Sequence, residues 1–273
     1  MRITLGDLTF DVRTDGPVDG RPVLLLHGFP QTGRCWEPLA ERLTATGLRT
    51  LAPDQRGYSP GARPAGVSAY RLDLLVGDAV GLLDALGLAA VDVVGHDWGA
   101  VVAWALAAGH PDRVRTLTAV SVPHPAAYAW ALSNDADQQV RSAYIRLFQT
   151  EDSAERVLLA EGGRRLRAMF GDLDPTAVDG YLAAMSEPGA LTAALCWYRA
   201  LPTAPVTGPV AVPTTYVWSS GDVAVGSVAA RRCGRHVTGP YRLVELAGVS
   251  HWVPEEAPDA LAGAVLDRIA PDR

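Results

Sequence analysis

Cysteine is scarce in this sequence of 273 residues, which has only Cys35, Cys196 and Cys233. Their number is odd, their spacing is wide and no C-x-x-C pair occurs. Neither a disulfide framework nor a zinc site built on paired cysteines is therefore expected. Thiols without such partners are typical of a reducing compartment, and we expect a protein of the cytoplasm.

Long hydrophobic runs and an excess of positive charge are also missing. The longest apolar run, GAVVAWALAA, has about ten residues, whereas a helix that crosses a bilayer needs about 20. The N-terminal MRITLGDLTFDV alternates like a strand and lacks the apolar centre of a signal peptide. The formal net charge of −6 gives no broad basic surface. We therefore expect neither a membrane nor a nucleic acid as partner.

The order of the apolar segments indicates an α/β fold. Strand-like runs occupy residues 1–12, 21–28, 48–54, 90–95 and 114–122, and helical periodicity covers 35–47, 70–87 and 98–110. Strand signals return at 212–222 and 241–248, and a last helix is expected at 254–270. Such alternation predicts a mainly parallel central sheet flanked by helices on both faces.

The sequence changes character between the two groups of strands. Residues 124–205 show helical periodicity, are rich in Ala, Leu, Arg, Asp and Glu, and carry no strand signal. We interpret them as a helical cap, or lid, inserted into a core of residues 1–123 and 206–273. The length of the chain fits one α/β domain with such an insertion.

A candidate nucleophile follows the strand at 90–95, in the sequence GHDWGA. Gly95 and Gly99 lie two residues before and two residues after Asp97. Small neighbours are needed where a chain turns sharply from strand to helix with one side chain at the apex, as in a nucleophile elbow, here with Asp in place of Ser. The helix N-terminus would favour an ionised carboxylate, the form that a carboxylate nucleophile needs. The alternative is that Asp97 only caps the helix.

Two partners follow in the chain order nucleophile, acid, histidine. Asp222 ends the strand-like YVWSSGD, and His251 lies in GVSHW, before the last helix. Asp222 would orient His251, which would act as a general base on water. Taken alone, each residue also fits a structural role, Asp222 in a turn and His251 in a local pair. The loop SVPHP after residues 114–122 offers no rival carboxylate.

The motif LLLHGFP at residues 24–30 completes the candidate site. Gly28 frees the backbone after the strand, and the N–H groups of Phe29 and Trp98 would form an oxyanion hole. A cis peptide bond between Phe29 and Pro30 would fit this loop.

Three polar residues beside these motifs are interpreted as structural. We expect His27 to be buried and to brace the loop that follows it. His96 is expected to pack under the elbow. Asp54, in PDQRGYSPG, is expected to brace the oxyanion loop.

Together, HGFP, GHDWGA, the Asp222 turn and GVSHW make the chain resemble the α/β-hydrolase superfamily over nearly its whole length. An Asp nucleophile is typical of its epoxide hydrolase and haloalkane or haloacid dehalogenase branches. The resemblance implies that Asp97 attacks an sp³ carbon and forms an alkyl-enzyme ester. Water then attacks this ester, and the oxyanion hole serves that second step.

Epoxide hydrolases resemble one another in using cap tyrosines to protonate the epoxide oxygen. GALTAALCWYRAL is similar to the segment of their second tyrosine, which usually reads N-W-Y-R, and places Tyr198 in the donor role with Cys196 in place of Asn. SAYIRLFQ is similar to the first segment, but Leu147 stands where a tyrosine is expected. Tyr144, one helical turn earlier, could substitute. For both tyrosines the alternative is a core aromatic.

The residues that we expect around the substrate are Tyr144, Leu147, Trp197, Trp252 and Pro30. The substrate would be a small, mostly apolar molecule held between core and cap. No metal or organic cofactor is implied, because no H-x-x-x-H occurs and the glycines at 28–33 lack the Rossmann spacing. A homodimer is left open.

The resemblance favours an epoxide hydrolase, which adds water to an epoxide and forms a vicinal diol. A dehalogenase with the same triad is one alternative. Trp98 fits both branches, but Phe29 stands where haloalkane dehalogenases commonly carry Asn. Fluoroacetate-type relatives share the HGFPQ start but usually carry Arg after the nucleophile. A cyclase or lactonase of secondary metabolism and a non-catalytic binding protein are the remaining alternatives.

Overall fold

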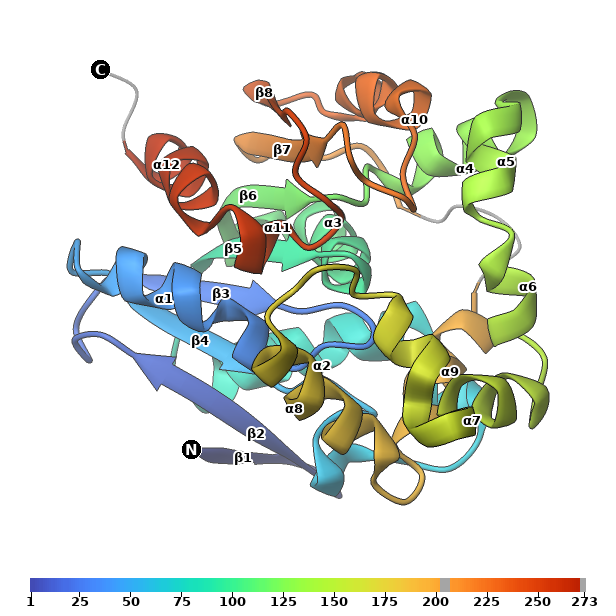
Figure 1. The fold of residues 1–273 in the computed structure, drawn as a ribbon. Helices are drawn as coiled ribbons and strands as arrows, with labels where there is room; N and C mark the ends of the chain where they lie inside the picture. The colour runs from blue at the N-terminus through green and yellow to red at the C-terminus, as the bar shows by residue number, and fades with distance from the viewer. Residues whose placement is uncertain (202–206, 271–273) are drawn as a thin grey trace.

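One mostly parallel sheet forms the centre of the molecule (Figure 1). In the computed structural model, which describes residues 1–201 and 207–270, its eight strands follow the order β1-β2-β4-β3-β5-β6-β7-β8. The β1–β2 and β2–β4 pairs are antiparallel and the other pairs are parallel. The strands are β1 (Arg2–Leu5), β2 (Leu8–Asp15), β3 (Pro22–Leu26), β4 (Arg49–Pro53), β5 (Val91–His96), β6 (Val114–Val120), β7 (Thr214–Ser219) and β8 (Tyr241–Leu246). The predicted fold class is confirmed.

Helices cover both faces of this sheet (Figure 1). One face carries α1 (Glu37–Thr44), α11 (Val253–Glu256) and α12 (Pro258–Ile269), and the other carries α2 (Leu72–Ala85) and α3 (Trp98–Gly109). The central strands β3 and β5 are buried along their whole length, as expected for strands covered on both faces. No helix in the described part of the chain is both long and apolar enough to cross a bilayer.

Between β6 and β7, residues 125–199 are mainly helical. We call the helices of this stretch the inserted helices: α4 (Pro125–Asn134), α5 (Ala136–Arg141), α6 (Tyr144–Phe148), α7 (Ser153–Ala168), α8 (Pro175–Ser186) and α9 (Ala190–Arg199). The short α10 (Ser227–Arg232) follows β7. The cap boundary predicted at residues 205 and 206 lies outside the described residues.

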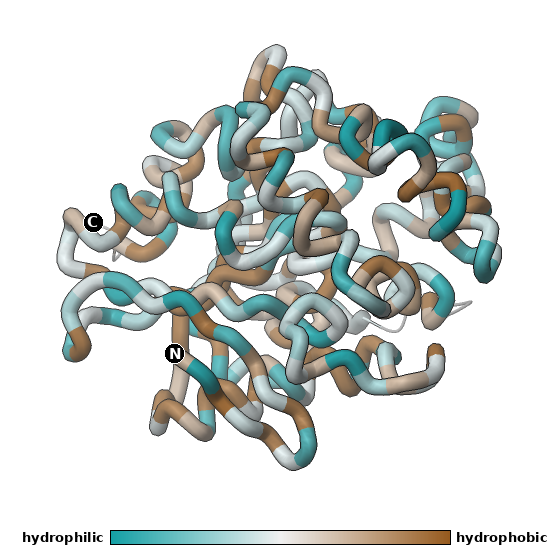
Figure 2. Tube along the Cα trace, turned by 60° about the horizontal axis from the view of Figure 1, so that its bottom comes forward, coloured by the Kyte–Doolittle hydropathy of each residue, from teal (hydrophilic) through white to brown (hydrophobic). Residues whose placement is uncertain are grey.

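The N-terminal segment differs from the prediction of one strand over residues 1–12. It forms the hairpin β1–β2, which turns at Gly6 with a φ of 58°. Glycine adopts this left-handed conformation without the steric cost that a Cβ brings. Apolar and polar residues alternate along the hairpin (Figure 2), so its pattern fits two strands as well as one. Only the turn at Gly6 separates the two.

The C-terminal segment forms two helices where residues 254–270 predicted one. α11 ends at Glu256, Ala257 has an extended φ of −133°, and α12 begins at Pro258. Proline has no N–H and its ring clashes with a preceding helical turn, so a helix stops before it and restarts with proline in its first turn. The break gives α11 its own direction, at the edge of the candidate site.

A single charge interrupts the apolar strand β5. Asp92 is 1% exposed. Arg21 donates to its two oxygens from Nε and Nη2 at 2.6 and 2.8 Å, and the Thr116 hydroxyl donates to Oδ1 at 2.8 Å. The Arg21 side chain is 37% exposed and so reaches the carboxylate from the surface. The bidentate guanidinium therefore compensates a carboxylate that is buried in the centre of the sheet.

We expect Arg21→Ala to lower the free energy of unfolding by about 1–3 kcal/mol, because Asp92 would keep only Thr116 as a side-chain donor. Chemical denaturation measures this loss. Arg71→Ala is the matched control, because the Arg71–Asp73 pair is 62% and 58% exposed and should contribute less than about 1 kcal/mol. Equal losses in the two variants would contradict the role given to the Arg21 pair.

Candidate active site

Asp97 lies at the apex of a sharp turn between β5 and α3. Its φ of 52° is unusual for a residue with a side chain. The turn is crowded, because a Cβ at Gly95 would collide with the Gly99 carbonyl and a Cβ at Gly99 would collide with the Leu26 carbonyl. A Cβ at Gly28 would collide with Asp97 itself. The glycines around the turn are therefore required by close backbone approach.

The Asp97 carboxylate does not cap α3, since its side chain makes no capping hydrogen bond. The Phe29 N–H donates to Oδ1 at 2.8 Å, and the Trp98 N–H also stabilises the charged form. Burial acts to raise the pKa of Asp97, but His251 and these donors outweigh it and hold the pKa below its ordinary value. The group is therefore ionised, with one oxygen in the cradle predicted as an oxyanion hole.

His251 lies between two carboxylates. Its Nδ1 is 3.1 Å from both oxygens of Asp222, and its Nε2 is 3.7 Å from Asp97 Oδ2. Burial acts to lower the pKa of His251, but Asp222 and Asp97 raise it to about 10. Burial would raise the pKa of Asp222, yet His251 and a serine hydroxyl lower it to about 2. With Asp97 ionised, His251 is therefore a cation.

Ser121 is a residue of this site that the sequence analysis missed. It follows β6 with a φ of 67°, and its hydroxyl donates to Asp222 Oδ2 at 2.6 Å and lies 3.0 Å from His251 Nδ1. The Tyr216 hydroxyl holds the Ser121 carbonyl at 2.5 Å. The only signal in the sequence was its place at the end of a central strand, because a serine there forms no motif.

The two candidate tyrosines lie together, beside the residue that follows Asp97. The ring centroids of Tyr144, at the start of α6, and Tyr198, on α9, are 6.3 Å apart, and the Tyr198 ring packs against Trp98. Burial raises the pKa of both well above the ordinary value, and the charge of Asp97 adds to this. Both phenols are therefore protonated. Leu147 is half-buried and packs against the core.

Aromatic rings line the space next to these phenols. Tyr198 is 5.4 Å from Phe29, 5.1 Å from Trp98 and 5.0 Å from Phe148, measured between ring centroids. Pro30 is buried behind Phe29, to which it is joined by the expected cis peptide bond.

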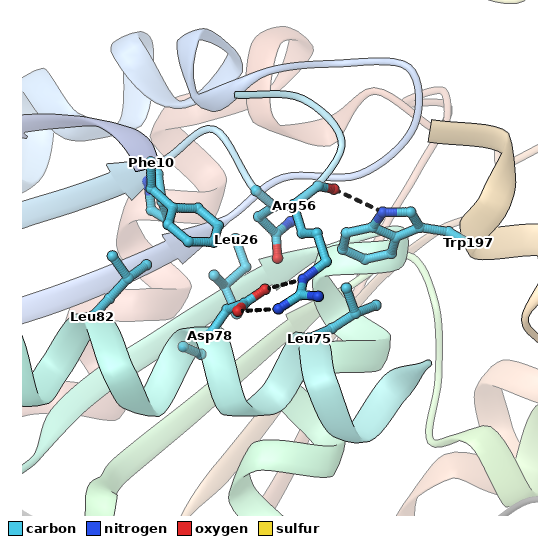
Figure 3. A pocket seen from close by; sticks show the side chains of 10 residues that line it. Phe10, Leu26, Arg56, Leu75, Asp78, Leu82 and Trp197 are labelled. Carbon is cyan, nitrogen blue, oxygen red and sulfur yellow. Dashed lines mark hydrogen bonds and ion pairs between the residues drawn. The ribbon is translucent and has the colours of Figure 1, made fainter. Parts of the chain in front are cut away.

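Trp197, on α9, and Trp252, in the loop between β8 and α11 that carries His251 (the histidine loop), both donate hydrogen bonds from their indole N–H groups. Trp197 donates to the Arg56 carbonyl at 2.9 Å (Figure 3), beside a pocket of only about 10 Å³. Such a volume holds one water molecule at most. Trp252 donates to the Met169 carbonyl at 3.1 Å, which ties the histidine loop to the end of α7. Their rings also pack against the site, since Trp197 lies 5.6 Å from Trp98 and Trp252 lies 4.9 Å from His251, measured between ring centroids.

The residues expected to brace the site are buried and hydrogen-bonded. The Gln55 N–H donates to His27 Nε2 at 3.1 Å, and Asp54 Oδ1 accepts the Gly33 N–H at 2.7 Å. His96 contacts the backbone oxygen of His251 at 2.9 Å. Within residues 1–201 and 207–270, His, Cys, Asp and Glu form no group of three or more that could hold a metal.

Comparisons with known proteins agree with this geometry. The sequence model of the alpha/beta hydrolase fold family matches residues 21–258. AB hydrolase superfamily protein YfhM of Bacillus subtilis is 33% identical over 97% of this chain and 96% of its own. Epoxide hydrolase A of Mycobacterium tuberculosis is 32% identical over 91% of this chain and 90% of its own.

A solved structure gives the same result. It comes from work on novel epoxide hydrolases in metagenomes from hot environments, and it superposes with a TM-score of 0.89 at 30% identity. The match covers 100% of this chain and 98% of that chain. The resemblance seen in the motifs is thereby confirmed: the chain belongs to the α/β-hydrolase family and is an epoxide hydrolase-like protein within it.

Proposed function

We propose that this protein hydrolyses an epoxide to a vicinal diol through an alkyl-enzyme ester on Asp97. The observation that carries the proposal is the difference between the two oxygens of this carboxylate. Oδ1 accepts the Phe29 N–H at 2.8 Å, whereas Oδ2 faces His251 at 3.7 Å. Oδ2 is thus available to attack carbon, and Oδ1 is the oxygen on which negative charge would develop when water attacks the ester.

Ring opening needs a proton donor for the leaving oxygen. Asp97 Oδ2 would form a bond to one epoxide carbon as the C–O bond of the ring breaks, and the released oxygen would take the proton of Tyr198. The ring of Tyr144 lies 6.3 Å from that of Tyr198, and Tyr144 would be the second donor. A phenol whose pKa is raised by burial keeps its proton until negative charge appears on the substrate.

Ester hydrolysis needs a neutral imidazole. Esterification removes the negative charge of Asp97, one of the two charges that hold the proton on His251. His251 can then lose this proton, which restores the Tyr198 phenol, and accept another from the attacking water, while Asp222 stabilises the imidazolium that forms. The water oxygen bonds to the Asp97 carboxyl carbon, and the bond from this carbon to Oδ2 breaks. The diol leaves with Oδ2, which takes the remaining proton of the water, so Asp97 is again a carboxylate beside cationic His251.

The walls of the site favour an apolar substrate. The rings of Phe29, Phe148 and Trp98 pack around Tyr198 with centroid separations of 5.0 to 5.4 Å, and Phe148 also packs against Tyr144. A ligand with one polar oxygen and an apolar body would match two donors set among aromatic rings. The epoxide would lie between the sheet edge and the inserted helices, which act as the cap.

His251→Gln should stop the reaction at the ester, because no base activates water. We expect incubation with a panel of epoxides to raise the intact mass by that of the whole epoxide, with the adduct mapped to Asp97. The double variant His251→Gln with Asp97→Asn is the control and should gain no mass. An adduct from a haloalkane panel that carries the alkyl group without its halogen would instead indicate a dehalogenase.

Tyr198→Phe should lower kcat for epoxide hydrolysis about 100-fold, within the range of general-acid catalysis. Tyr144→Phe should cost about 10-fold, because Tyr198 remains. Tyr128→Phe is the matched control on α4, since its hydroxyl is paired with Ser142 at 2.7 Å, and it should leave kcat within about threefold. Unchanged kcat in Tyr198→Phe would rule out this phenol as the acid.

Asp97→Asn should lower the pKa of His251 from about 10 by about 1–3 pH units, because one of its two carboxylate partners loses its charge. NMR titration of the imidazole measures the change, and the intact mass verifies that the new amide is not hydrolysed. A pKa of His251 that stays near 10 would mean that loss of the Asp97 charge does not prepare His251 as a base.

A further inference from the structure

A chain of buried and half-buried polar side chains runs from the inserted helices to the candidate base. Tyr181, on α8, donates its hydroxyl to Glu255 Oε1 at 2.9 Å, and the Gln31 amide lies 2.5 Å from the same oxygen. The other end of this amide lies 3.1 Å from His96 Nδ1. His96 Nε2 lies 2.9 Å from the backbone oxygen of His251.

The chain has two possible proton arrangements. His96 Nε2 must carry a proton in both, because its neighbour is the carbonyl oxygen of His251. In the first, Glu255 is a carboxylate that accepts the Gln31 N–H, and the Gln31 oxygen accepts a second proton of His96, which is then a cation. In the second, Gln31 is turned by a half-turn, Glu255 donates its own proton to the amide oxygen, and neutral His96 accepts the amide N–H.

Three observations favour the second arrangement. The separation of 2.5 Å between Gln31 and Glu255 is short for N–H···O but within the range of O–H···O. Glu255 Oε2 is buried without a partner among the described residues, which costs far less for a neutral acid than for a carboxylate. Burial raises the pKa of Glu255 to about 7 and lowers that of His96 to about 4.

We propose that Glu255 is a positioning residue that acts as a neutral carboxylic acid, and that it fixes His96, through Gln31, as a neutral donor to the His251 carbonyl. This inference rests on the proposed function, since it concerns the base of that reaction. Glu255 touches neither substrate nor reacting atoms, and its effect reaches them only through Gln31, His96 and the histidine loop.

A neutral His96 matters because of its distance from the base. The two imidazole rings are 4.8 Å apart, and His251 becomes a cation whenever it takes a proton from water. A second cation at this distance, away from bulk water, would weaken His251 as a base. The chain supplies a hydrogen bond to the histidine loop without adding positive charge beside it.

Ionisation of Glu255 would break this chain of hydrogen bonds. The Glu255 carboxylate and the unprotonated Nδ1 of His96 would both have to accept a hydrogen bond from the NH₂ group of Gln31, which can reach only one of them. The titratable groups that act on Glu255 or Tyr181 from the neighbouring elements are Cys35, Arg34 and His251. Burial opposes the ionisation of Glu255, while the hydrogen bonds from Tyr181 and Gln31 and the positive charge of His251 favour it.

The test compares Glu255→Gln with the wild type from about pH 6 to pH 9. The new amide can donate to the Gln31 oxygen and accept from Tyr181 as the neutral acid does, but it cannot ionise. We expect wild-type kcat to fall as pH rises through about 7, and the ratio of variant to wild-type kcat to rise about tenfold across the range. Glu255→Ala should have a kcat about 10-fold below that of Glu255→Gln at pH 6, with KM little changed.

Glu187→Gln is the matched control. Glu187 also links the inserted helices to the core, through Arg63 at 2.8 Å, but lies outside the chain. Its pH profile should follow the wild type. The proposal is overturned if Glu255→Gln shows the same fall with pH as the wild type, or if it is folded but as inactive at pH 6 as Glu255→Ala.

A second measurement does not depend on substrate. The ¹⁵N signals of the His96 imidazole near pH 6, assigned with His96→Gln, should show a protonated Nε2 and a bare Nδ1. A doubly protonated ring would overturn the proposal. If the wild type turned over no epoxide, the proposed function would fail, and these signals would still decide the state of the chain.

Discussion

An ionised carboxylate on a buried, strained turn is the constraint around which this molecule is arranged. A φ of 52° costs Asp97 on the order of 1–3 kcal/mol, and it persists because β5 is paired on both sides and α3 starts at the next residue. The register Leu26↔Gly95 brings the end of β3 beside the turn. Phe29 therefore reaches Asp97 with its N–H, and any side chain at Gly28 would block this contact.

The charges of the site follow from the same burial. Asp97 and Asp222 are both ionised and His251 is a cation, so one positive charge lies between two negative charges. The other titratable groups nearby, among them both phenols, are held neutral by burial. Loss of the negative charge of Asp97 therefore has a strong effect on the pKa of His251, because water and other ions do not screen the interaction between the two groups.

Much of this site was predictable because its motifs are local. The spacing of Gly95, Asp97 and Gly99 follows from the steric limits of one turn, so it can be recognised in the sequence. The order of Asp222 and His251 at strand ends reflects the sheet edge at which parallel strands meet. The N-terminal hairpin and the break before Pro258 were missed because each depends on one residue inside a pattern that continues on both sides.

The residues that could not be predicted act across the fold. Ser121 contacts Asp222 and His251, residues 101 and 130 positions away in the chain, and nothing near it in the sequence marks this role. The same holds for Gln31 and Glu255, which are 224 positions apart in the chain although their side chains are hydrogen-bonded. Polar residues of this kind are identified by counting donors and acceptors in three dimensions, because burial makes each unpaired group costly.

Trp98 shows how a neighbour can decide the role of a residue that two enzyme branches share. Its sequence position fits a halide-binding indole as well as an epoxide hydrolase. In the structure the Trp98 ring packs edge-on against the Tyr198 ring, with centroids 5.1 Å apart. The helix α9 brings the phenol here, and Gln149 donates to the Tyr198 carbonyl at 3.2 Å, so the inserted helices place a phenol beside the indole. Under the proposed function, residues outside the sheet thus direct the same triad toward a leaving oxygen.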